Sequence, residues 1–364
     1  MYIIQIVPAL PPSINGLGDY ALNLARQLRD DFEIDTHFVV ADPSWLDSGH
    51  IESFPVLKLS NRSQYVLLNV LQMPQDCLTV LLHYVGYGYA KRGCPDWLVS
   101  GLSKWKANSP KVQLITMFHE VAASGPPWTS AFWLSGLQHQ LAKRLVQTSD
   151  RVITSKRSYA ELLQCYAPGR FDSIPTLPVF STVGEPQNPS SLAERTRRLV
   201  IFGGRSQRSK VYKNSFEQLR QICSHLDIQH IFDIGPPLDS LPPYVGTVPI
   251  TANGCLPSEA VSAILSDSIA GFFSYHPAFL GKSTILAAYC AHRVIPVSAT
   301  MSEFLEEGLQ PGKHYALPSQ YNTEKCDMVL MQAIADNAYH WYQSHCLASQ
   351  TQIFAAHVLE NITI

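Results

Sequence analysis

The stretch Leu199-Val200-Ile201-Phe202-Gly203-Gly204-Arg205 decides how this chain is organised, because it restarts a pattern already used in the first half. Its apolar run predicts a buried strand, and the two glycines that follow allow a tight turn. The preceding segment, 181–197, is polar, contains prolines and has no periodicity, which is typical of a linker. The stretch therefore predicts that a second domain begins near residue 198.

Apolar strand-like runs alternate with helix-like runs on both sides of this linker. Strands that are continuously apolar and separated by helices predict parallel sheets covered on both faces. We therefore predict an α/β chain with two doubly wound, Rossmann-like domains at 1–180 and 198–335, followed by C-terminal helices at 336–364. The predicted strands are 2–7, 34–40, 55–59, 78–83, 112–118, 151–154 and 172–175 in the first domain, and 199–203, 230–234, 245–249, 269–274 and 293–297 in the second. The clearest predicted helices are 19–29, 63–72, 130–147 and 156–165, then 213–226, 257–266 and 284–292.

The composition limits the classes of partner. Of 364 residues, 46% are hydrophobic and 15% are charged, which fits a compact globular chain, and the formal net charge is −2. Such a charge produces no overall attraction for nucleic acid or an acidic membrane, so we expect no nucleic-acid partner. No basic amphipathic stretch indicates membrane contact. Any anion site must arise from a local cluster of side chains.

The cellular location is predicted from the cysteines and the first residues. The eight cysteines include no CxxC pair, which argues against a zinc ribbon or a redox motif and favours a reducing compartment. Residues 1–10 read as a buried strand rather than a signal peptide, and no apolar run has the length of a membrane span. We therefore expect a cytoplasmic protein.

In the first domain, polar residues and glycines follow the predicted strands. Gly16 and Gly18 lie in the loop after the first strand, which borders the ligand crevice of an open α/β sheet. They also suit an ordinary tight turn, since the full GxGxxG pattern is absent. His83 and His119 each stand at the end of a strand. Both histidines are expected at the same edge of the sheet.

In the second domain, basic residues gather near two predicted helix starts. Arg205 leaves the strand tip directly, and Lys210 or Lys213 is expected to open the next helix. The segment Gly281-Lys282-Ser283-Thr284 opens a later helix, where free N–H groups and a partial positive charge favour phosphate. A Walker A loop would need glycine at position 276, which is His276. The alternative for both clusters is a solvated basic surface.

Motifs for other chemistry are missing. No acidic pair at metal-ligand spacing, HExxH sequence or GxSxG sequence occurs in a plausible loop, so hydrolysis by a metal or a serine is not supported and no metal site is predicted.

Together these features resemble the GT-B glycosyltransferases, and most closely the retaining group called family 4. The resemblance implies two Rossmann-like domains that face a cleft, a nucleotide-sugar held mainly by the second domain, and a final helix that packs back on the first. It implies that His119 lies near the donor sugar and acts in catalysis, and that Gly16 and Gly18 approach the donor and acceptor. It implies a diphosphate site at Arg205, Lys210, Lys282 and Ser283, and acceptor or sugar contacts from His83, Tyr84 and Glu120.

The sequence departs from this family at one point. The family carries two glutamates eight residues apart beside the donor sugar and ribose, whereas residues 275–300 contain no acidic residue. Diphosphate binding is therefore better supported than the usual sugar and ribose contacts.

We expect a metal-independent glycosyltransferase, retaining and hexosyltransferase-like, that serves carbohydrate biosynthesis by moving a sugar from a UDP- or GDP-linked donor to a hydroxyl on a glycan, lipid or small molecule. No cofactor is expected beside this co-substrate. One alternative is a non-catalytic relative that binds a sugar nucleotide or glycan and acts as a partner subunit. The other is a nucleoside triphosphate enzyme, suggested by Gly281-Lys282-Ser283-Thr284 and opposed by His276.

Overall fold

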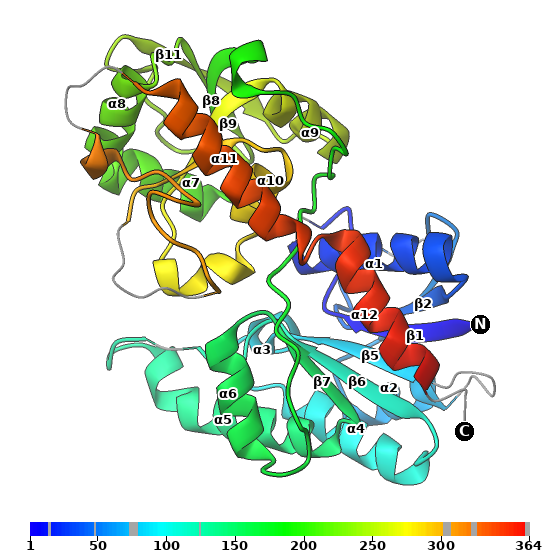
Figure 1. Ribbon diagram of the computed structural model, residues 1–364. Helices are drawn as coiled ribbons and strands as arrows, with labels where there is room; N and C mark the ends of the chain where they lie inside the picture. The colour runs from blue at the N-terminus through cyan, green and yellow to red at the C-terminus, as the bar shows by residue number, and fades with distance from the viewer. Residues whose placement is uncertain are drawn as a thin grey trace. The chain divides into compact units, whose positions relative to one another are not determined.

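A computed structural model describes residues 1–13, 16–46, 49–72, 79–123, 125–300, 307–321 and 326–360 (Figure 1). The chain divides into two compact units. The first unit comprises Met1–Pro178 and Gln350–Ile364, and the second comprises Val179–Ser349. Each unit has its own sheet and its own hydrophobic core.

The sheet of the first unit has the strand order β3-β4-β2-β1-β5-β6-β7, and all neighbours are parallel except β3 and β4. The chain builds outward from β1 to β4 on one side and then returns to place β5 on the other side of β1. The strands are β1 (Tyr2–Val7), β2 (Asp35–Val40), β3 (His50–Ile51), β4 (Phe54–Lys58), β5 (Thr79–Tyr84), β6 (Gln113–Phe118) and β7 (Arg151–Thr154). The helices are α1 (Gly16–Phe32), α2 (Gln64–Leu71), α3 (Gly86–Tyr89), α4 (Asp96–Asn108), α5 (Ser130–Thr148) and α6 (Arg157–Tyr166).

Helices cover both faces of this sheet (Figure 1). Ile4 and Ile6 of β1 belong to a buried cluster with residues of α2, α4 and α5. Phe38 and Val40 of β2 belong to a second cluster, with residues of α1. Because both faces are buried, the strands carry continuous apolar runs, and the predicted doubly wound α/β fold is confirmed.

The second unit repeats the arrangement. Its strand order is β10-β11-β9-β8-β12-β13, parallel except between β10 and β11. The strands are β8 (Thr196–Phe202), β9 (His230–Ile234), β10 (Tyr244–Val245), β11 (Val248–Gly254), β12 (Ser268–Phe273) and β13 (Ile295–Ser298). The helices are α7 (Arg205–Asn214), α8 (Phe216–His225), α9 (Ser258–Ser266), α10 (Thr284–Ala291) and α11 (Met328–Gln343), with short 3₁₀ turns η1 (Leu192–Glu194), η2 (Pro277–Lys282) and η3 (Pro318–Gln320).

The last helix, α12 (Leu347–Leu359), belongs to the first unit from Gln350 onward. The Tyr20 hydroxyl of α1 donates to Gln350 Oε1 at 2.6 Å, and Gln350 Nε2 donates to the Pro178 carbonyl oxygen at 2.6 Å. Gln350 is fully buried, so these bonds fix the helix against the first sheet's α1 layer. No helix within the described ranges has the length and apolarity to cross a bilayer.

Three predictions differ from the structure. The single strand predicted at 245–249 spans the turn between two antiparallel strands, β10 and β11, at which Gly246 has a φ of 60°. Residues 172–175 form no strand, because Pro175 has no N–H for a ladder; the chain makes a single bridge between Thr154 and Thr176 instead. The helix predicted at 213–226 corresponds to α8, which begins after Ser215, and the separate helix α7 before it was not predicted. Helix α7 was missed because its sequence is polar on nearly every side and therefore lacks the apolar periodicity of an amphipathic helix.

We expect Gly271→Ala to destabilise the second unit. A Cβ at Gly271 would lie 2.3 Å from the ring of Tyr289, whose hydroxyl donates to the Val200 carbonyl oxygen at 2.9 Å and is therefore held in place. Such overpacking costs about 1–3 kcal/mol or more. The matched control is Gly136→Ala, because nothing lies within 4 Å of its added Cβ and helix propensity should then stabilise α5 by about 0.5–1 kcal/mol. Urea unfolding midpoints measure both, and equal midpoints would contradict this packing.

Candidate functional site

The second sheet changes its direction of growth between β8 and β12, and the carboxyl ends of these strands border a small, open recess. Ligands of open α/β sheets bind at such switch points. The recess is lined by residues of β8, α7, β12 and α10. Its polar lining includes Gln207, Ser274, Tyr275 and Ser283.

Helix α7 begins at this recess without a capping side chain. Gly203 has a φ of 124°, and Gly204 is the N-cap residue. A Cβ at Gly203 would lie 2.7 Å from Ile285 Cδ1, so the turn requires glycine. The first N–H groups of α7 therefore lack a side-chain acceptor, and its end carries the partial positive charge of the helix dipole.

Helix α10 begins on the other side of the recess. Ser283 is its N-cap, and the Leu286 N–H donates to Ser283 Oγ at 3.2 Å. Lys282 ends the η2 turn with Nζ 5.5 Å from the centre of the Phe279 ring. The N–H groups of Thr284 and Ile285 have no partner inside the helix. Ser283 and Ile285 at the start of α10 and Gln207 in the first turn of α7 thus line one recess.

The predicted residue Arg205 is the first residue of α7. It is exposed, and its Nη1 lies 3.8 Å from Asp239 Oδ1. Lys210 is also exposed, but it lies in the middle of α7. The prediction that Lys210 opens a helix is therefore wrong, because the helix already begins at Arg205. Lys210 therefore does not lie at a helix N-terminus, as the predicted diphosphate site required.

Arg208 is the buried cation of this region, and the sequence analysis assigned it no role. It is 1% exposed, its Nη1 donates to Asp233 Oδ1, and its Nε donates to the Gly203 carbonyl oxygen at 2.9 Å. The Tyr212 hydroxyl donates to Asp233 Oδ2 at 2.8 Å. Burial and the Asp233 carboxylate raise the pKa of Tyr212, so this hydroxyl remains a donor. The network is complete within the protein and therefore has a structural role.

Gln207 differs from Arg208, because its Oε1 is buried with no hydrogen-bond partner among the described residues. Gln207 also lines the recess. An unpaired buried acceptor costs free energy, so at the wall of a recess it suits a ligand that donates a hydrogen bond. The sequence offered no signal for this, since an amide in a polar segment is usually solvated.

The first unit has a polar chain at its own switch point, between β1 and β5. His83 Nε2 lies 2.8 Å from Gln5 Oε1, and His83 Nδ1 lies 3.1 Å from His119 Nε2. Gln5 Nε2 donates to Thr36 Oγ1 at 3.2 Å, which leaves Gln5 Oε1 as the acceptor from His83. His83 Nδ1 then accepts a hydrogen bond from His119 Nε2, and the His83 ring is neutral. Burial is the main cause that lowers the pKa of His83 well below its usual value, and the neighbouring His119 ring lowers it further.

The sequence predicted that both histidines would meet at one sheet edge, and they do. It missed Gln5, although one glutamine in an otherwise apolar strand was the available signal. The Tyr20 ring packs edge-on against His119, with centroids 4.9 Å apart. His119 and Glu120 are each partly exposed, whereas His83 is fully buried.

Two further predicted residues have packing roles. Tyr84 is fully buried in the core against Phe118, with ring centroids 5.2 Å apart, so the predicted acceptor contact is not supported. Gly16 and Gly18 lie in the first turn of α1 rather than in a loop before it. A Cβ at Gly18 would lie 2.5 Å from the Ala9 carbonyl oxygen, whereas one at Gly16 would meet nothing within 4 Å. Close approach of the backbone explains Gly18.

Within the described ranges, no group of three or more His, Cys, Asp or Glu side chains could hold a metal ion.

No protein-family model and no curated protein sequence matches the chain. Solved structures do match it over its full length. An α-glucosyltransferase in complex with UDP-glucose and DNA containing an abasic site matches with a TM-score of 0.60 at 11% identity, covering 99% of both chains. The lipopolysaccharide outer core galactosyltransferase WaaB matches with a TM-score of 0.56 at 11% identity, covering 99% of both chains. The chain has the GT-B fold.

The GT-B fold alone does not decide the reaction. A UDP-N-acetylglucosamine 2-epimerase from Listeria monocytogenes, described as putative, matches as well, with a TM-score of 0.55 at 13% identity, covering 100% of this chain and 96% of its own. Function must therefore be argued from the residues of the site.

We expect acidification to destabilise the first unit through His83. In the unfolded chain His83 binds a proton below about pH 6.5, whereas the buried neutral ring does not. The unfolding free energy should fall as pH drops below that value, by up to about 1.4 kcal/mol per pH unit. In His83→Phe this contribution is absent, so the pH slope should be shallower even if the variant is less stable overall. Urea titrations between about pH 7 and pH 5 measure the slopes. Identical slopes would show that His83 is not held neutral.

Proposed function

We propose that the chain transfers a sugar from a nucleoside diphosphate donor to a hydroxyl acceptor, and that the donor binds at the recess between β8 and β12. The observation that carries this proposal is the meeting of two helix N-termini, α7 and α10, at one recess that also contains the unpaired Gln207 acceptor. Helix N-termini favour phosphate, and a buried amide oxygen favours a hydroxyl or N–H group of the same ligand. A nucleotide-sugar carries both kinds of group.

Leaving-group stabilisation would supply most of the catalysis. As the glycosidic bond breaks, the bonding electrons move to the diphosphate oxygen and negative charge grows there. The N–H groups of Gly204 and Arg205, the Arg205 guanidinium and the N–H groups of Thr284 and Ile285 are proposed to meet that charge. Lys282 adds a cation next to the same helix start. We propose that this machinery acts without a metal.

His119 is proposed to contact the sugar, as the resemblance implies. An oxocarbenium-like sugar carries positive charge in the transition state. We propose that His119 is neutral when it contacts this sugar, so that no opposing cation lies beside it; its Nε2 donates to His83 Nδ1. We propose that the chain is a retaining hexosyltransferase. Residues 275–300 supply no carboxylate to the sugar, so His119 is the side chain proposed to contact it.

UDP or GDP remains the proposed carrier, and a glycan, lipid or small molecule the acceptor. One structural neighbour was solved with DNA, but the net charge of −2 gives this chain no general attraction for that polyanion. We therefore propose no nucleic-acid acceptor. The cysteines within the described residues are free thiols, and we propose a cytoplasmic location.

A second candidate is a non-catalytic subunit that binds a sugar nucleotide or a glycan. The observation in its favour is the absence of any acidic residue from 275 to 300, where the family places two glutamates. Both candidates predict donor binding, and only the enzyme predicts turnover.

The experiment combines a binding screen with a turnover assay. Thermal shifts with UDP-sugars, GDP-sugars and ATP with magnesium identify the donor, because a ligand well above its Kd raises the unfolding temperature. Nucleoside diphosphate release from each bound donor, with mixed hydroxyl acceptors, then measures transfer. Binding with release supports the enzyme, and binding without release supports the subunit. Magnesium-dependent binding of ATP alone would favour a nucleoside triphosphate enzyme over both.

We expect Arg205→Ala to weaken UDP or GDP binding by about 1.5–3 kcal/mol, roughly tenfold to a hundredfold, because a charge-assisted bond to the diphosphate is lost. Lys213→Ala is the matched control, since Lys213 is an exposed cation in the last turn of the same helix. Isothermal titration measures both affinities. If the two variants lose affinity equally, net charge rather than a specific contact is responsible.

We expect Gln207→Met to weaken donor binding about twofold to tenfold, through loss of one hydrogen bond of about 0.5–1.5 kcal/mol. The same change should leave the unfolding free energy of the unliganded protein equal or higher, because it removes a buried acceptor that has no partner. A purely structural amide would instead show lost stability with unchanged affinity, and that result would remove Gln207 from the site.

A further inference from the structure

An apolar surface surrounds the start of α5 in the first unit, and the proposed function does not use it. We call it the α5 patch and define it by Trp128, Phe132, Trp133 and Leu137, which are 84%, 47%, 75% and 44% exposed. These four come from one segment, 128–137, whereas other large exposed hydrophobic side chains of the described chain are scattered. Clustered exposure of this kind marks an interaction surface.

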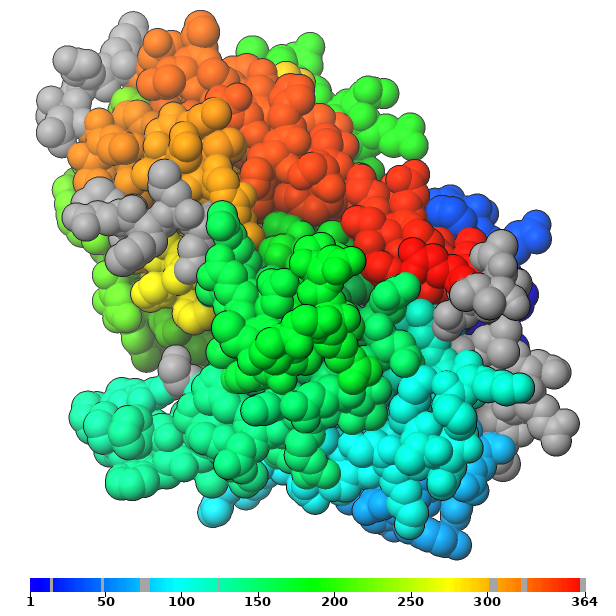
Figure 2. Space-filling view, turned by 60° about the horizontal axis from the view of Figure 1, so that its bottom comes forward, coloured from blue at the N-terminus to red at the C-terminus, as the bar shows by residue number. Residues whose placement is uncertain are grey.

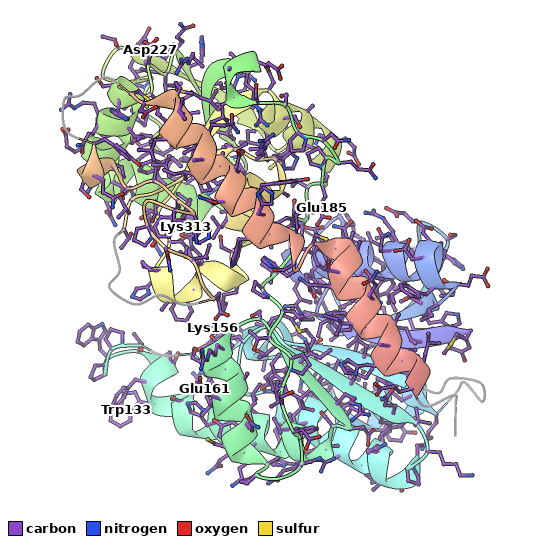
Figure 3. The ribbon with its side chains drawn as sticks, in the orientation of Figure 1. Trp133, Lys156, Glu161, Glu185, Asp227 and Lys313 are labelled. Carbon is purple, nitrogen blue, oxygen red and sulfur yellow. The ribbon has the colours of Figure 1, made fainter. Side chains whose placement is uncertain are left out.

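The patch stands out from the first unit. The teal atoms from the start of α5 and the loop before it protrude in Figure 2, and the labelled Trp133 side chain is directed outward from its helix in Figure 3. The Phe132 and Trp133 rings pack edge-on, with centroids 5.4 Å apart. The aromatic surface is therefore convex, and it suits insertion into a soft apolar layer better than capture of a small ligand.

The patch rests on a fixed base. The side chain of Gln138, 2% exposed, accepts from the Ala123 N–H at 2.8 Å and donates to the Arg92 carbonyl oxygen at 3.1 Å. These bonds tie the loop before α5 and the loop after α3 to the helix. Thr129 caps α5, with the Phe132 N–H donating to its Oγ1 at 3.4 Å. Binding through the patch would therefore lose little conformational entropy, because the backbone that carries it is already held by hydrogen bonds.

Positive charge surrounds the aromatic surface. Lys91 and Arg92 are exposed on the loop that Gln138 holds, and Lys143 is exposed on α5, eleven residues after Phe132 and therefore on the same helix face. Helix α5 contains no acidic residue. Among the ion pairs of the described residues, Arg144 of α5 pairs with Asp96 at 2.9 Å.

We propose that the α5 patch docks the protein on the surface of an anionic lipid bilayer. Tryptophan and phenylalanine prefer the interfacial layer of a membrane, while lysine and arginine remain at the level of the phosphate groups. The α5 patch has the same arrangement, with aromatic side chains at the start of α5 and the cations Lys91, Arg92 and Lys143 on the neighbouring loop and the same helix. A sugar chain is a poorer occupant, because the exposed residues of the first two helical turns include no carboxylate or amide to bind hydroxyl groups.

Vesicle co-sedimentation tests the proposal on the full chain. The protein should sediment with vesicles of phosphatidylcholine and phosphatidylglycerol, more weakly with phosphatidylcholine alone, and less in high salt. Trp128→Ser/Trp133→Ser should lower the partition at least tenfold. Tyr65→Ser is the matched control, since Tyr65 is 71% exposed on another helix of the same unit, and it should change nothing. Lys91→Glu/Arg92→Glu should remove the preference for the anionic vesicles.

Circular dichroism and gel filtration establish that each variant is folded and report its association state. Sedimentation that is absent from both vesicle types, or that is equal in the double tryptophan variant, overturns the proposal. Concentration-dependent dimerisation of the native chain that the double variant loses, without vesicle binding, would assign the patch to a second copy instead. Retention on immobilised polysaccharide without vesicle binding would assign it to a glycan, and either result is against a membrane.

Discussion

The buried ion pair between Arg208 and Asp233 is the interaction on which the geometry of the second unit's recess depends. Arg208 extends from α7 and binds the end of β9 through Asp233 and the turn after β8 through the Gly203 carbonyl oxygen. Removing one member of such a pair leaves a charge buried without compensation, at a cost of about 3–5 kcal/mol. Gly235 accommodates the arginine, since a Cβ there would lie 2.7 Å from Arg208 Nε. The first turn of α7 is thereby fixed at the sheet edge.

That constraint also determines which cations can reach a ligand. Arg208 is buried, whereas Arg205 at the start of the same helix is exposed. The sequence contains both arginines within four positions, and only the structure separates a structural role from an available one. Gln207, between them, lines the recess while its oxygen remains unpaired. The first turn of α7 therefore contains an exposed cation, Arg205, an unpaired acceptor, Gln207, and a buried structural arginine, Arg208.

In the first unit, too, a buried hydrogen-bonded network connects neighbouring strands at the sheet edge, here through Gln5 and two histidines. Gln5, His83 and His119 form a chain of hydrogen bonds across β1, β5 and the end of β6. Parallel neighbours bring residues at their carboxyl ends together, which is why the sequence could place the two histidines at one edge. It could not predict the direct bond or the Gln5 partner, because these depend on rotamers and tautomers. Most strands and the start of α10 were readable from local pattern, whereas α7 was not, since it lacks an apolar stripe.

Gly281-Lys282-Ser283-Thr284 shows how far a short motif can be read. Its order resembles the end of a P-loop, yet the chain before it is a 3₁₀ turn in which the Ala278 N–H donates to His276 Nδ1 at 3.2 Å. This backbone differs from a glycine-rich phosphate loop, because the N–H groups of Ala278, Phe279 and Ser283 are already used within the turn and its cap. What remains for an anion is the end of α10 itself and the neighbouring Lys282. The N-termini of α7 and α10, with Arg205 and Lys282, suit a diphosphate leaving group on which negative charge grows. This role requires no acidic residue, and residues 275–300 contain none.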